Sequence, residues 1–171
     1  MPVQRLNHAV LYVRNVDTTA GFYKDVLGFR TVFEMPGQAA FLQAAGSTND
    51  HDLGLFQIGS DAGPSAAGRR TVGLYHLAWE VDALAELERL AGLLGQRRAL
   101  VGASDHGTTK ALYAHDPDGI EFEVSWLVPA ELITPADRAS NAPGPLDISK
   151  EKARYGPDTQ GGVGVSHRAP V

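Results

Sequence analysis

Two segments of the chain share one pattern of apolar and polar positions. The first runs Leu-Asn-His-Ala-Val-Leu-Tyr-Val over residues 6–13, and the second runs Leu-Tyr-His-Leu-Ala-Trp-Glu-Val over residues 74–81. Their β-branched and aromatic residues are typical of strands. An aspartate follows each segment, Asp17 or Asp82, and a helical pattern begins directly after it. The sequence therefore predicts the same strand and helix twice.

The two predicted helices also end alike. The first spans residues 18–26 and is closed by Gly28, while the second spans residues 83–94 and is expected to stop at Gly95. In the second helix, leucines recur at helical spacing: Leu84, Leu87, Leu90 and Leu94. The step between the two strand histidines, His8 and His76, is 68 residues, and the step between the two glycines is 67. This constant register indicates a duplicated unit.

Short strand-like runs follow each helix. They cover residues 30–34, 39–43 and 53–58 in the first half, and residues 96–101, 109–114 and 120–126 in the second. Each half therefore reads βαβββ. We expect an α+β protein of two tandem βαβββ modules, about 5–58 and 71–128, whose two sheets can face each other across a shared central cleft.

Outside the modules the composition changes. Residues 59–70 form a linker of Gly, Ser, Ala and Pro between the modules. After Pro129 the periodic pattern decays, and residues 156–171 have almost no apolar face to bury. We therefore expect one domain over residues 1–128, followed by an extended C-terminal tail over residues 129–171.

Composition narrows the range of partners. The net charge is −5 and there is no basic surplus of the kind that binds nucleic acid or anionic lipid. No apolar run approaches the ~20 residues of a membrane span, and the N-terminus lacks the apolar core of a signal peptide. We expect a cytoplasmic protein. Because the chain contains no cysteine, any metal must be held by His, Asp or Glu.

Six histidines are candidates for chemistry: His8, His51, His76, His106, His115 and His167. A lone histidine in a strand is more often structural than a ligand. The repeat changes that balance, because His8 and His76 occupy the same position in two similar modules. Two converging imidazoles favour a divalent metal. His115 and His167 are expected to be exposed.

A carboxylate ligand is available in the second module. The sequence Asp116-Pro-Asp-Gly119 forms a turn that starts a strand, and alternation along that strand places Glu121 and Glu123 on one face. Alternation does not separate the two glutamates, and both could also be ordinary solvent-facing charges on a sheet.

Several of these motifs together resemble the vicinal oxygen chelate superfamily, which includes glyoxalase I, methylmalonyl-CoA epimerase, antibiotic-resistance proteins and type I extradiol dioxygenases. The resemblance covers about residues 5–128. It rests on residues 8–13, on Phe-Tyr-Lys-Asp-Val-Leu-Gly-Phe at 22–29, on residues 76–81, and on the Asp-Pro-Asp-Gly turn that leads into Glu123. It implies paired βαβββ modules whose sheets surround a central metal cleft, with the metal held by His8, His76 and Glu123, and with Glu123 in preference to Glu121.

The fourth metal position distinguishes members of this superfamily. Glyoxalase I and the epimerase have a glutamate there, whereas this chain has Gly54 in the matching place. Two histidines and one carboxylate would form a facial triad, which leaves adjacent positions open for a bidentate substrate and oxygen on iron(II). Manganese(II) can replace iron in relatives of this family.

A second resemblance is to the extradiol dioxygenase signature. His106, Leu112-Tyr113, Asp116-Pro117, Gly119 and Glu123 follow its spacing, and the sequence departs from it at Ser104. This resemblance implies that Tyr113 hydrogen-bonds the bound catecholate, that His106 contacts the substrate hydroxyl, and that His51 is the acid–base catalyst. The alternatives are a core tyrosine, a surface loop residue and a turn residue.

The expected activity is therefore extradiol ring cleavage of a catechol by oxygen, as in the catabolism of aromatic compounds. A homo-oligomer is also expected. The alternatives are a glyoxalase-like isomerase or epimerase that uses nickel, zinc or cobalt, and a metal-free binding protein of the bleomycin-resistance type. Four further aromatic residues are expected to pack in the core: Phe22, Tyr23, Phe29 and Phe33.

Overall fold

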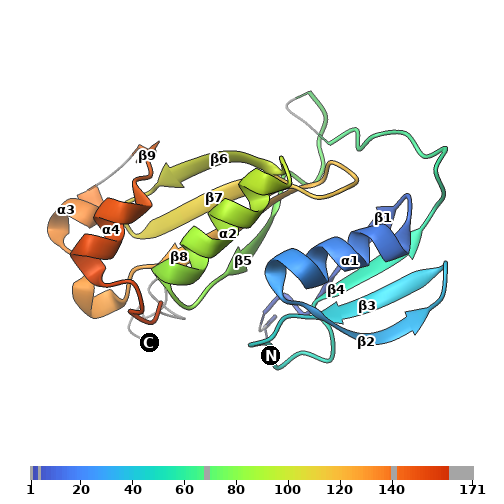
Figure 1. Ribbon diagram of the computed structural model, residues 1–171, viewed down its shortest axis with the longest axis horizontal. Coiled ribbons are helices and arrows are strands. Elements are labelled where there is room, and N and C mark those ends of the chain that lie inside the picture. The colour runs from blue at the N-terminus through green and yellow to red at the C-terminus, as the bar shows by residue number, and fades with distance from the viewer. Residues whose placement is uncertain (1, 4, 68–69, 140–141, 162–171) are drawn as a thin grey trace. The chain divides into compact units, whose positions relative to one another are not determined.

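The computed structural model describes residues 2–3, 5–67, 70–139 and 142–161 (Figure 1). Two compact units make up the fold. The N-terminal unit comprises Met1–Thr71 together with Asp116–Ile120, and the C-terminal unit comprises Val72–His115 and Glu121–Val171. Each unit is built around one β-sheet, and each is described by itself below.

The N-terminal unit has the predicted order of elements. These are β1 (Ala9–Val13), α1 (Val16–Leu27), β2 (Arg30–Met35), β3 (Ala39–Gln43) and β4 (Leu53–Gln57). The sheet order is β1-β4-β3-β2, in which β1 runs parallel to β4 and the other neighbours are antiparallel. Helix α1 packs against β3 and β4 and covers one face of the sheet (Figure 1).

Local sequence explains where α1 begins and ends. The side chain of Asn15 accepts a hydrogen bond from the Thr18 backbone N–H, which caps the first turn. Gly28 adopts a left-handed conformation with φ of 71° and ends the helix, as predicted. The buried face of α1 includes Tyr23 and Val26, both fully buried. Hydrophobic burial of this face holds the helix on the sheet.

The C-terminal unit repeats the order strand, helix and three strands. Its elements are β5 (Leu77–Glu80), α2 (Leu84–Gln96), β6 (Leu100–Asp105), β7 (Thr109–His115) and β8 (Glu121–Leu127). The sheet order is β5-β8-β7-β6-β9, and β5 runs parallel to β8 as β1 does to β4. The first strand and the helix each begin 68 residues later than in the N-terminal unit, at Leu77 after Ala9 and at Leu84 after Val16. The predicted α+β fold with two βαβββ modules is confirmed.

The end of α2 differs from the prediction. Gly95 does not stop the helix, which continues to Gln96, and the left-handed turn is made by Arg98 with φ of 55°. The backbone N–H of Arg97 still bonds to the Leu93 carbonyl, so a glycine in the last turn is tolerated. Strand β6 consequently begins at Leu100, and the strand predicted over residues 96–101 is displaced toward the C-terminus.

The extended tail predicted from residue 129 is wrong for the described residues as far as 161. This segment contains η1 (Ala130–Leu132), α3 (Pro135–Ala139), β9 (Gly144–Pro145) and α4 (Ile148–Tyr155). Strand β9 pairs with β6, and α4 packs against α2. The indole N–H of Trp126 donates to the Thr159 carbonyl at 3.1 Å. Residues 162–171, including His167, lie outside the described residues.

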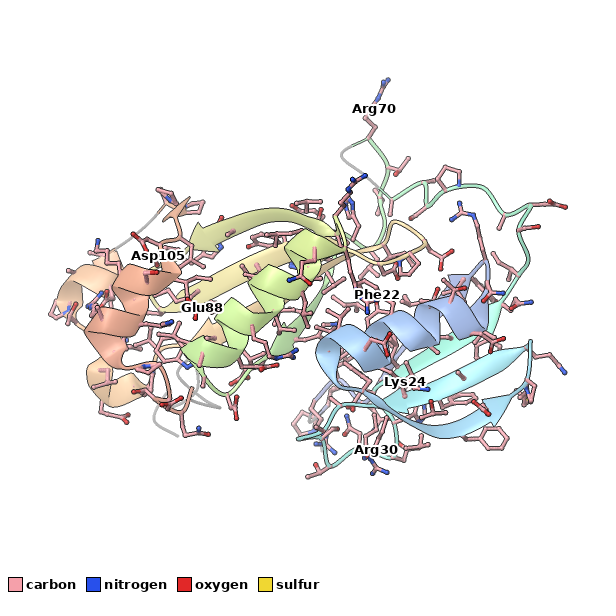
Figure 2. The ribbon with its side chains drawn as sticks, viewed as in Figure 1. Phe22, Lys24, Arg30, Arg70, Glu88 and Asp105 are labelled. Carbon is pink, nitrogen blue, oxygen red and sulfur yellow. The ribbon has the colours of Figure 1, made fainter. Side chains whose placement is uncertain are left out.

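Ion pairs hold α4 in place, and this explains why the apolar pattern did not predict it. The ammonium of Lys110, on β7, is buried and lies 2.6 Å from Asp105 and 3.0 Å from Glu151 of α4. Glu88 of α2 pairs with Lys152 of α4 at 2.5 Å. Figure 2 labels Glu88 and Asp105, which lie near this helix. Pairing of a buried charge offsets much of its desolvation cost.

Helix length bears on the membrane question. The longer helices of the described chain, α1 and α2, have 12 and 13 residues. A transmembrane helix needs about 20 apolar residues. Within the described residues, none of the helices has the length and apolar character needed to cross a bilayer.

Candidate metal and substrate site

His8 and His76 occupy equivalent places in the two units. His8 directly precedes β1 and His76 directly precedes β5. The two strands are equivalent, since each runs parallel to the last strand of its own βαβββ module. The side chain of His8 is exposed and that of His76 is half-buried.

Sheet register identifies the counterpart of Glu123 in the N-terminal unit. In the C-terminal unit Glu123 lies opposite Ala78, two residues after His76. In the N-terminal unit Gly54 lies opposite Val10, two residues after His8. Gly54 is therefore the register equivalent of Glu123, so one unit offers a histidine with a carboxylate and the other a histidine without one.

Two carboxylates flank the imidazole of His76. Its Nε2 lies 3.2 Å from Glu123 Oε2, and its Nδ1 lies 3.8 Å from Glu121 Oε1. Both glutamates are half-buried, whereas Phe122 and Val124 between and after them are fully buried. The predicted alternation is confirmed. The two glutamates differ in the ring nitrogen that they face: Glu123 lies beside Nε2 of His76, and Glu121 lies on the side of Nδ1.

Tyr113 and His106 lie beside this pair. Tyr113 on β7 is the direct register partner of Glu123, and its ring centroid is 5.8 Å from that of His76. Its hydroxyl forms a 2.9 Å hydrogen bond with His106 Nε2. Burial raises the pKa of Tyr113, and the charge of Glu123 raises it further. Tyr113 is therefore a neutral phenol at physiological pH.

A second histidine accompanies His8 in the N-terminal unit. The ring centroids of His8 and His51 are 4.4 Å apart, with an interplanar angle of 32°. The Nδ1 of His8 lies 2.7 Å from Asn7 Oδ1, and the Nδ1 of His51 lies 3.1 Å from Asp50 Oδ2. Both oxygens are acceptors, so Nδ1 is the donor in each pair. The backbone N–H of His51 lowers the pKa of Asp50, which keeps that carboxyl ionised.

Aromatic side chains continue from His51 across the sheet. The ring of Phe41 meets His51 edge-on at 5.2 Å, and Phe33 and Phe56 lie 5.9 and 5.8 Å from Phe41. Phe33 is 58% exposed, so its assignment to the core is wrong. The reason is that β2 turns this side chain to the face of the sheet that α1 does not cover. The other three predicted core aromatics, Phe22, Tyr23 and Phe29, are buried.

The structure does not assemble the predicted metal site within one unit. Among the described residues there is no group of three or more His, Asp and Glu side chains placed to hold a metal ion. His76 and Glu123 lie together in the C-terminal unit, and His8 belongs to the N-terminal unit. The donor set itself fits a divalent metal, because the Nδ1 of His8 is engaged as a donor and its Nε2 carries the lone pair.

His115 is not part of the candidate site, whereas Asn7 and Asp50 contact candidate site histidines. His115 is exposed, as predicted, and its Nε2 lies 3.7 Å from Glu121 Oε2. Asn7 and Asp50 were not predicted as site residues. Each directly precedes a candidate histidine in the sequence, and this adjacency is the signal that could have identified them.

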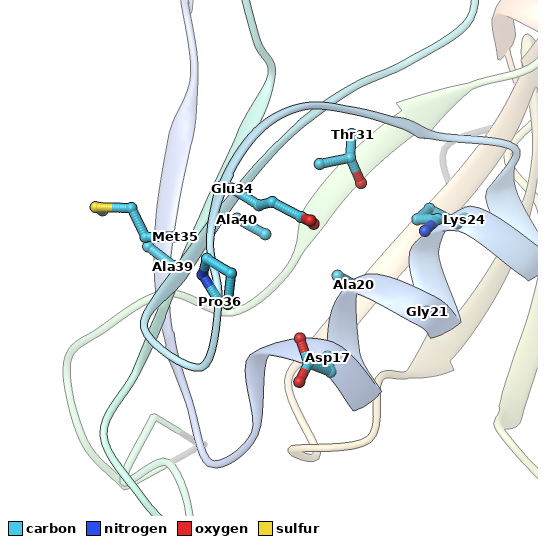
Figure 3. A pocket seen from close by; sticks show the side chains of 10 residues that line it. All are labelled: Asp17, Ala20, Gly21, Lys24, Thr31, Glu34, Met35, Pro36, Ala39 and Ala40. Atoms are coloured by element: carbon cyan, nitrogen blue, oxygen red, sulfur yellow. The ribbon is translucent and has the colours of Figure 1, made fainter.

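The N-terminal unit also contains a small cavity of about 160 Å³ between α1 and the β2–β3 hairpin (Figure 3). The charged residues that line it, Asp17, Lys24 and Glu34, are all exposed. None of the predicted site residues lines this cavity. The candidate chemistry is therefore separate from it.

Comparisons with known proteins agree with the fold and with the family resemblance. The model of the Glyoxalase/Bleomycin resistance protein/Dioxygenase superfamily matches residues 5–124. Catechol-2,3-dioxygenase of Bacillus subtilis (strain 168) is 30% identical over 122 residues, which cover 70% of this chain and 40% of that protein. Biphenyl-2,3-diol 1,2-dioxygenase 3 of Rhodococcus globerulus is 32% identical over 126 residues, covering 70% of this chain and 62% of that protein. The chain thus spans less than two thirds of the length of either relative.

A solved structure shares the fold. The glyoxylase/bleomycin resistance protein/dioxygenase domain from Frankia sp. EAN1pec superimposes with a TM-score of 0.61 and is 20% identical. The match covers 72% of this chain and 92% of that chain. At this identity the likeness concerns the fold alone.

Proposed function

The chain belongs to the Glyoxalase/Bleomycin resistance protein/Dioxygenase superfamily, and we propose that it is an extradiol dioxygenase that cleaves a catechol-type diol with oxygen at an iron(II) centre. Sequence similarity to two dioxygenases that are named for aromatic diols supports this choice. Their greater length makes the activity a proposal for this chain.

The observation that carries the proposal is the register equivalence of Gly54 and Glu123. It leaves a donor set of two histidines and one carboxylate, His8, His76 and Glu123, which would hold the metal. That set is typical of non-haem iron oxygenases, because it keeps neighbouring coordination positions open. When bound, iron(II) brings the diol and oxygen together and allows electrons to pass between them.

Tyr113 and His106 would orient the diol. The pKa of Tyr113 is raised by burial and by Glu123, so its hydroxyl keeps its hydrogen and can donate it to a substrate oxygen. His106, hydrogen-bonded to the same hydroxyl at 2.9 Å, fixes the direction in which the phenol points. Such positioning contributes to catalysis because it removes unproductive orientations of the substrate.

His51 would move the proton. Asp50 lies 3.1 Å from its Nδ1 and holds the hydrogen there, which leaves Nε2 free to accept a proton from a diol hydroxyl and to return it later. Phe41, which packs edge-on against His51, would limit the orientations that the imidazole can adopt. The carboxylate partner separates His51 from His8, whose partner is an amide.

Anaerobic loading with iron(II), followed by measurement of oxygen uptake with catechol, tests the proposal. We expect about one iron per chain, and uptake of one oxygen molecule per diol with formation of a yellow ring-cleavage product. Turnover of a hemithioacetal with nickel or zinc and without oxygen would instead identify an isomerase. Tight ligand binding without any metal requirement would identify a binding protein.

A further inference from the structure

The Nδ1 atom of His76 is buried and makes no hydrogen bond among the described residues. The carboxylate oxygen Oε1 of Glu121 lies 3.8 Å from it, which is beyond hydrogen-bond length. Glu121 is half-buried, and its other carboxylate oxygen, Oε2, lies 3.7 Å from His115 Nε2. On the opposite edge of the ring, Nε2 faces Glu123 at 3.2 Å.

His8, the equivalent histidine of the N-terminal unit, also has a side-chain oxygen near its Nδ1. The Nδ1 of His8 lies 2.7 Å from the side-chain oxygen of Asn7. An amide oxygen can only accept, so Nδ1 carries the hydrogen and Nε2 of the neutral ring carries the lone pair. His8 and His76 thus each have an oxygen acceptor near Nδ1 and an Nε2 that points elsewhere.

Sheet register explains why the acceptor beside Nδ1 is a glutamate for His76 and an asparagine for His8. Glu121 directly precedes the β8 residue that pairs with Leu77, so it stands beside His76. The corresponding residue in the N-terminal unit is Asp52, but its carboxylate already accepts bonds from the Ala44 N–H, the Ser47 hydroxyl and the Asn49 amide. The acceptor for His8 therefore comes from Asn7.

We propose that Asn7 and Glu121 are positioning residues that hold the Nδ1 hydrogens of His8 and His76, so that each imidazole presents Nε2 to the metal. The inference rests on the metal site of the proposed function and deepens it. A metal-binding imidazole must offer a lone pair, and an acceptor on its other nitrogen fixes both the tautomer and the ring orientation. Glu123 is then the ligand, and Glu121 acts through His76.

The first test is the affinity of the full chain for zinc(II), which serves as a diamagnetic probe, measured by calorimetric titration. Glu121→Ala and Asn7→Ala are each expected to weaken binding by about 10- to 100-fold. Glu121→Gln keeps an acceptor oxygen and should recover most of the lost affinity. Glu80→Ala is the matched control, since Glu80 is an exposed carboxylate at the end of β5.

The second test reads the histidine tautomers directly. In the zinc-loaded protein with ¹⁵N-labelled histidine, the proposal expects His76 to show a hydrogen on Nδ1 that exchanges slowly with water. Glu121→Ala should make that exchange fast, and Glu80→Ala should leave it unchanged. Unfolding midpoints of all variants establish that the fold is retained.

The outcomes separate this inference from the function on which it rests. Equal zinc affinity for the parent protein, Glu121→Ala and Glu80→Ala overturns the inference and leaves the metal site standing. A hydrogen found on Nε2 of His76 in the zinc-loaded protein also overturns it. Failure of the parent protein to bind zinc or iron overturns both the inference and the proposed function.

Discussion

The oxygen atom that faces the Nδ1 of each histidine distinguishes the roles within the candidate site. His8 faces an amide oxygen of Asn7, whereas His51 faces the carboxylate of Asp50. Both oxygens accept the Nδ1 hydrogen, which leaves Nε2 of each ring as the nitrogen available for chemistry. His51, with the charged partner, is the residue proposed to transfer a proton, and His8, with the amide partner, is proposed as a metal ligand.

Removal of single ligands should separate the two glutamates of β8. Glu123→Ala is expected to abolish iron retention, because it deletes the one carboxylate that faces His76 Nε2. Glu121→Ala should weaken binding and still retain measurable iron. Metal analysis after gel filtration provides the measurement. Full iron in Glu123→Ala, together with none in Glu121→Ala, would reverse the assignment.

His51→Asn should slow turnover without loss of metal. Positioned proton transfer contributes about 10²- to 10⁴-fold, so ring cleavage should fall by that factor while iron and catechol still bind. The measurement is single-turnover kinetics, in which the anaerobic complex with catechol is mixed with oxygen. Asp50→Asn should show a smaller loss, since it keeps an acceptor near Nδ1. An unchanged rate in His51→Asn would exclude the acid–base role.

Tyr113→Phe should alter substrate binding and leave iron content unchanged. The variant loses the hydroxyl that bonds with His106 and that is proposed to orient the diol. We expect a lower kcat/KM for catechol, by about 10-fold for one lost hydrogen bond of roughly 1.4 kcal/mol. Steady-state oxygen uptake measures it. Loss of iron from this variant would instead make Tyr113 part of the structural support of Glu123.

At the level of elements, the periodic sequence pattern predicted the strands and helices of both modules. It did not predict features that depend on individual contacts, such as the end of α2. The constant 68-residue step located both histidine strands and both helices, because side chains of a duplicated fold recur in register. The end of α2 depended on Arg98 adopting a left-handed turn, which no apolar pattern indicates. Alternation placed Glu121 and Glu123 on one face without separating them. The family resemblance favoured Glu123, and the structure adds which ring nitrogen of His76 each glutamate faces.

The pairing of β1 with β4 leads to a prediction about Gly54. A Cβ at this position would lie 3.4 Å from Val10 and 3.6 Å from Phe41, contacts that small side-chain shifts can accommodate. Gly54→Glu then places a carboxylate in the register position that Glu123 has in the other sheet. We expect metal to be retained and catechol cleavage to be lost, because the added ligand occupies an open coordination position.

Metal analysis and oxygen uptake measure this outcome, and Gly54→Ala is the control for packing. The alanine variant should retain most of the activity, since it adds only the methyl group. Undiminished cleavage by Gly54→Glu would show that residue 54 does not face the metal.

At the level of the whole molecule, the C-terminal segment belongs to the fold as much as the two modules do. Lys110 is only 1% exposed, and its ammonium is paired with Glu151 of α4. Tyr155 on the same helix packs against the core residue Trp126 at 5.4 Å. The short α4 has few apolar residues, so charge pairing decides its position, and amino-acid composition alone suggested a tail.

The Asp137–Arg154 ion pair should make stability depend on pH. Asp137 is buried and accepts two hydrogen bonds from Arg154, at 2.8 and 2.9 Å, and two from Thr134. Arg154 holds the pKa of Asp137 well below its usual range. At pH values between the folded-state pKa of Asp137 and its ordinary value, the unfolded chain binds more protons than the folded chain, so stability falls as pH falls. The contribution is complete above the ordinary Asp pKa of about 3.9 and is lost progressively below it.

Asp137→Asn is accordingly expected to lower the unfolding free energy at pH 7 by about 1.5–3 kcal/mol, the range for hydrogen bonds to charged groups. Urea denaturation at pH 7, 5, 4 and 3 measures it, with the exposed Asp158→Asn as the control. The gap between the parent protein and Asp137→Asn should be constant from pH 7 to 5 and should narrow toward pH 3, because Asp137 of the unfolded parent chain binds a proton there while Asp137 of the folded chain stays ionised. A gap that stays constant to pH 3 would mean that Asp137 contributes through packing and not through its charge.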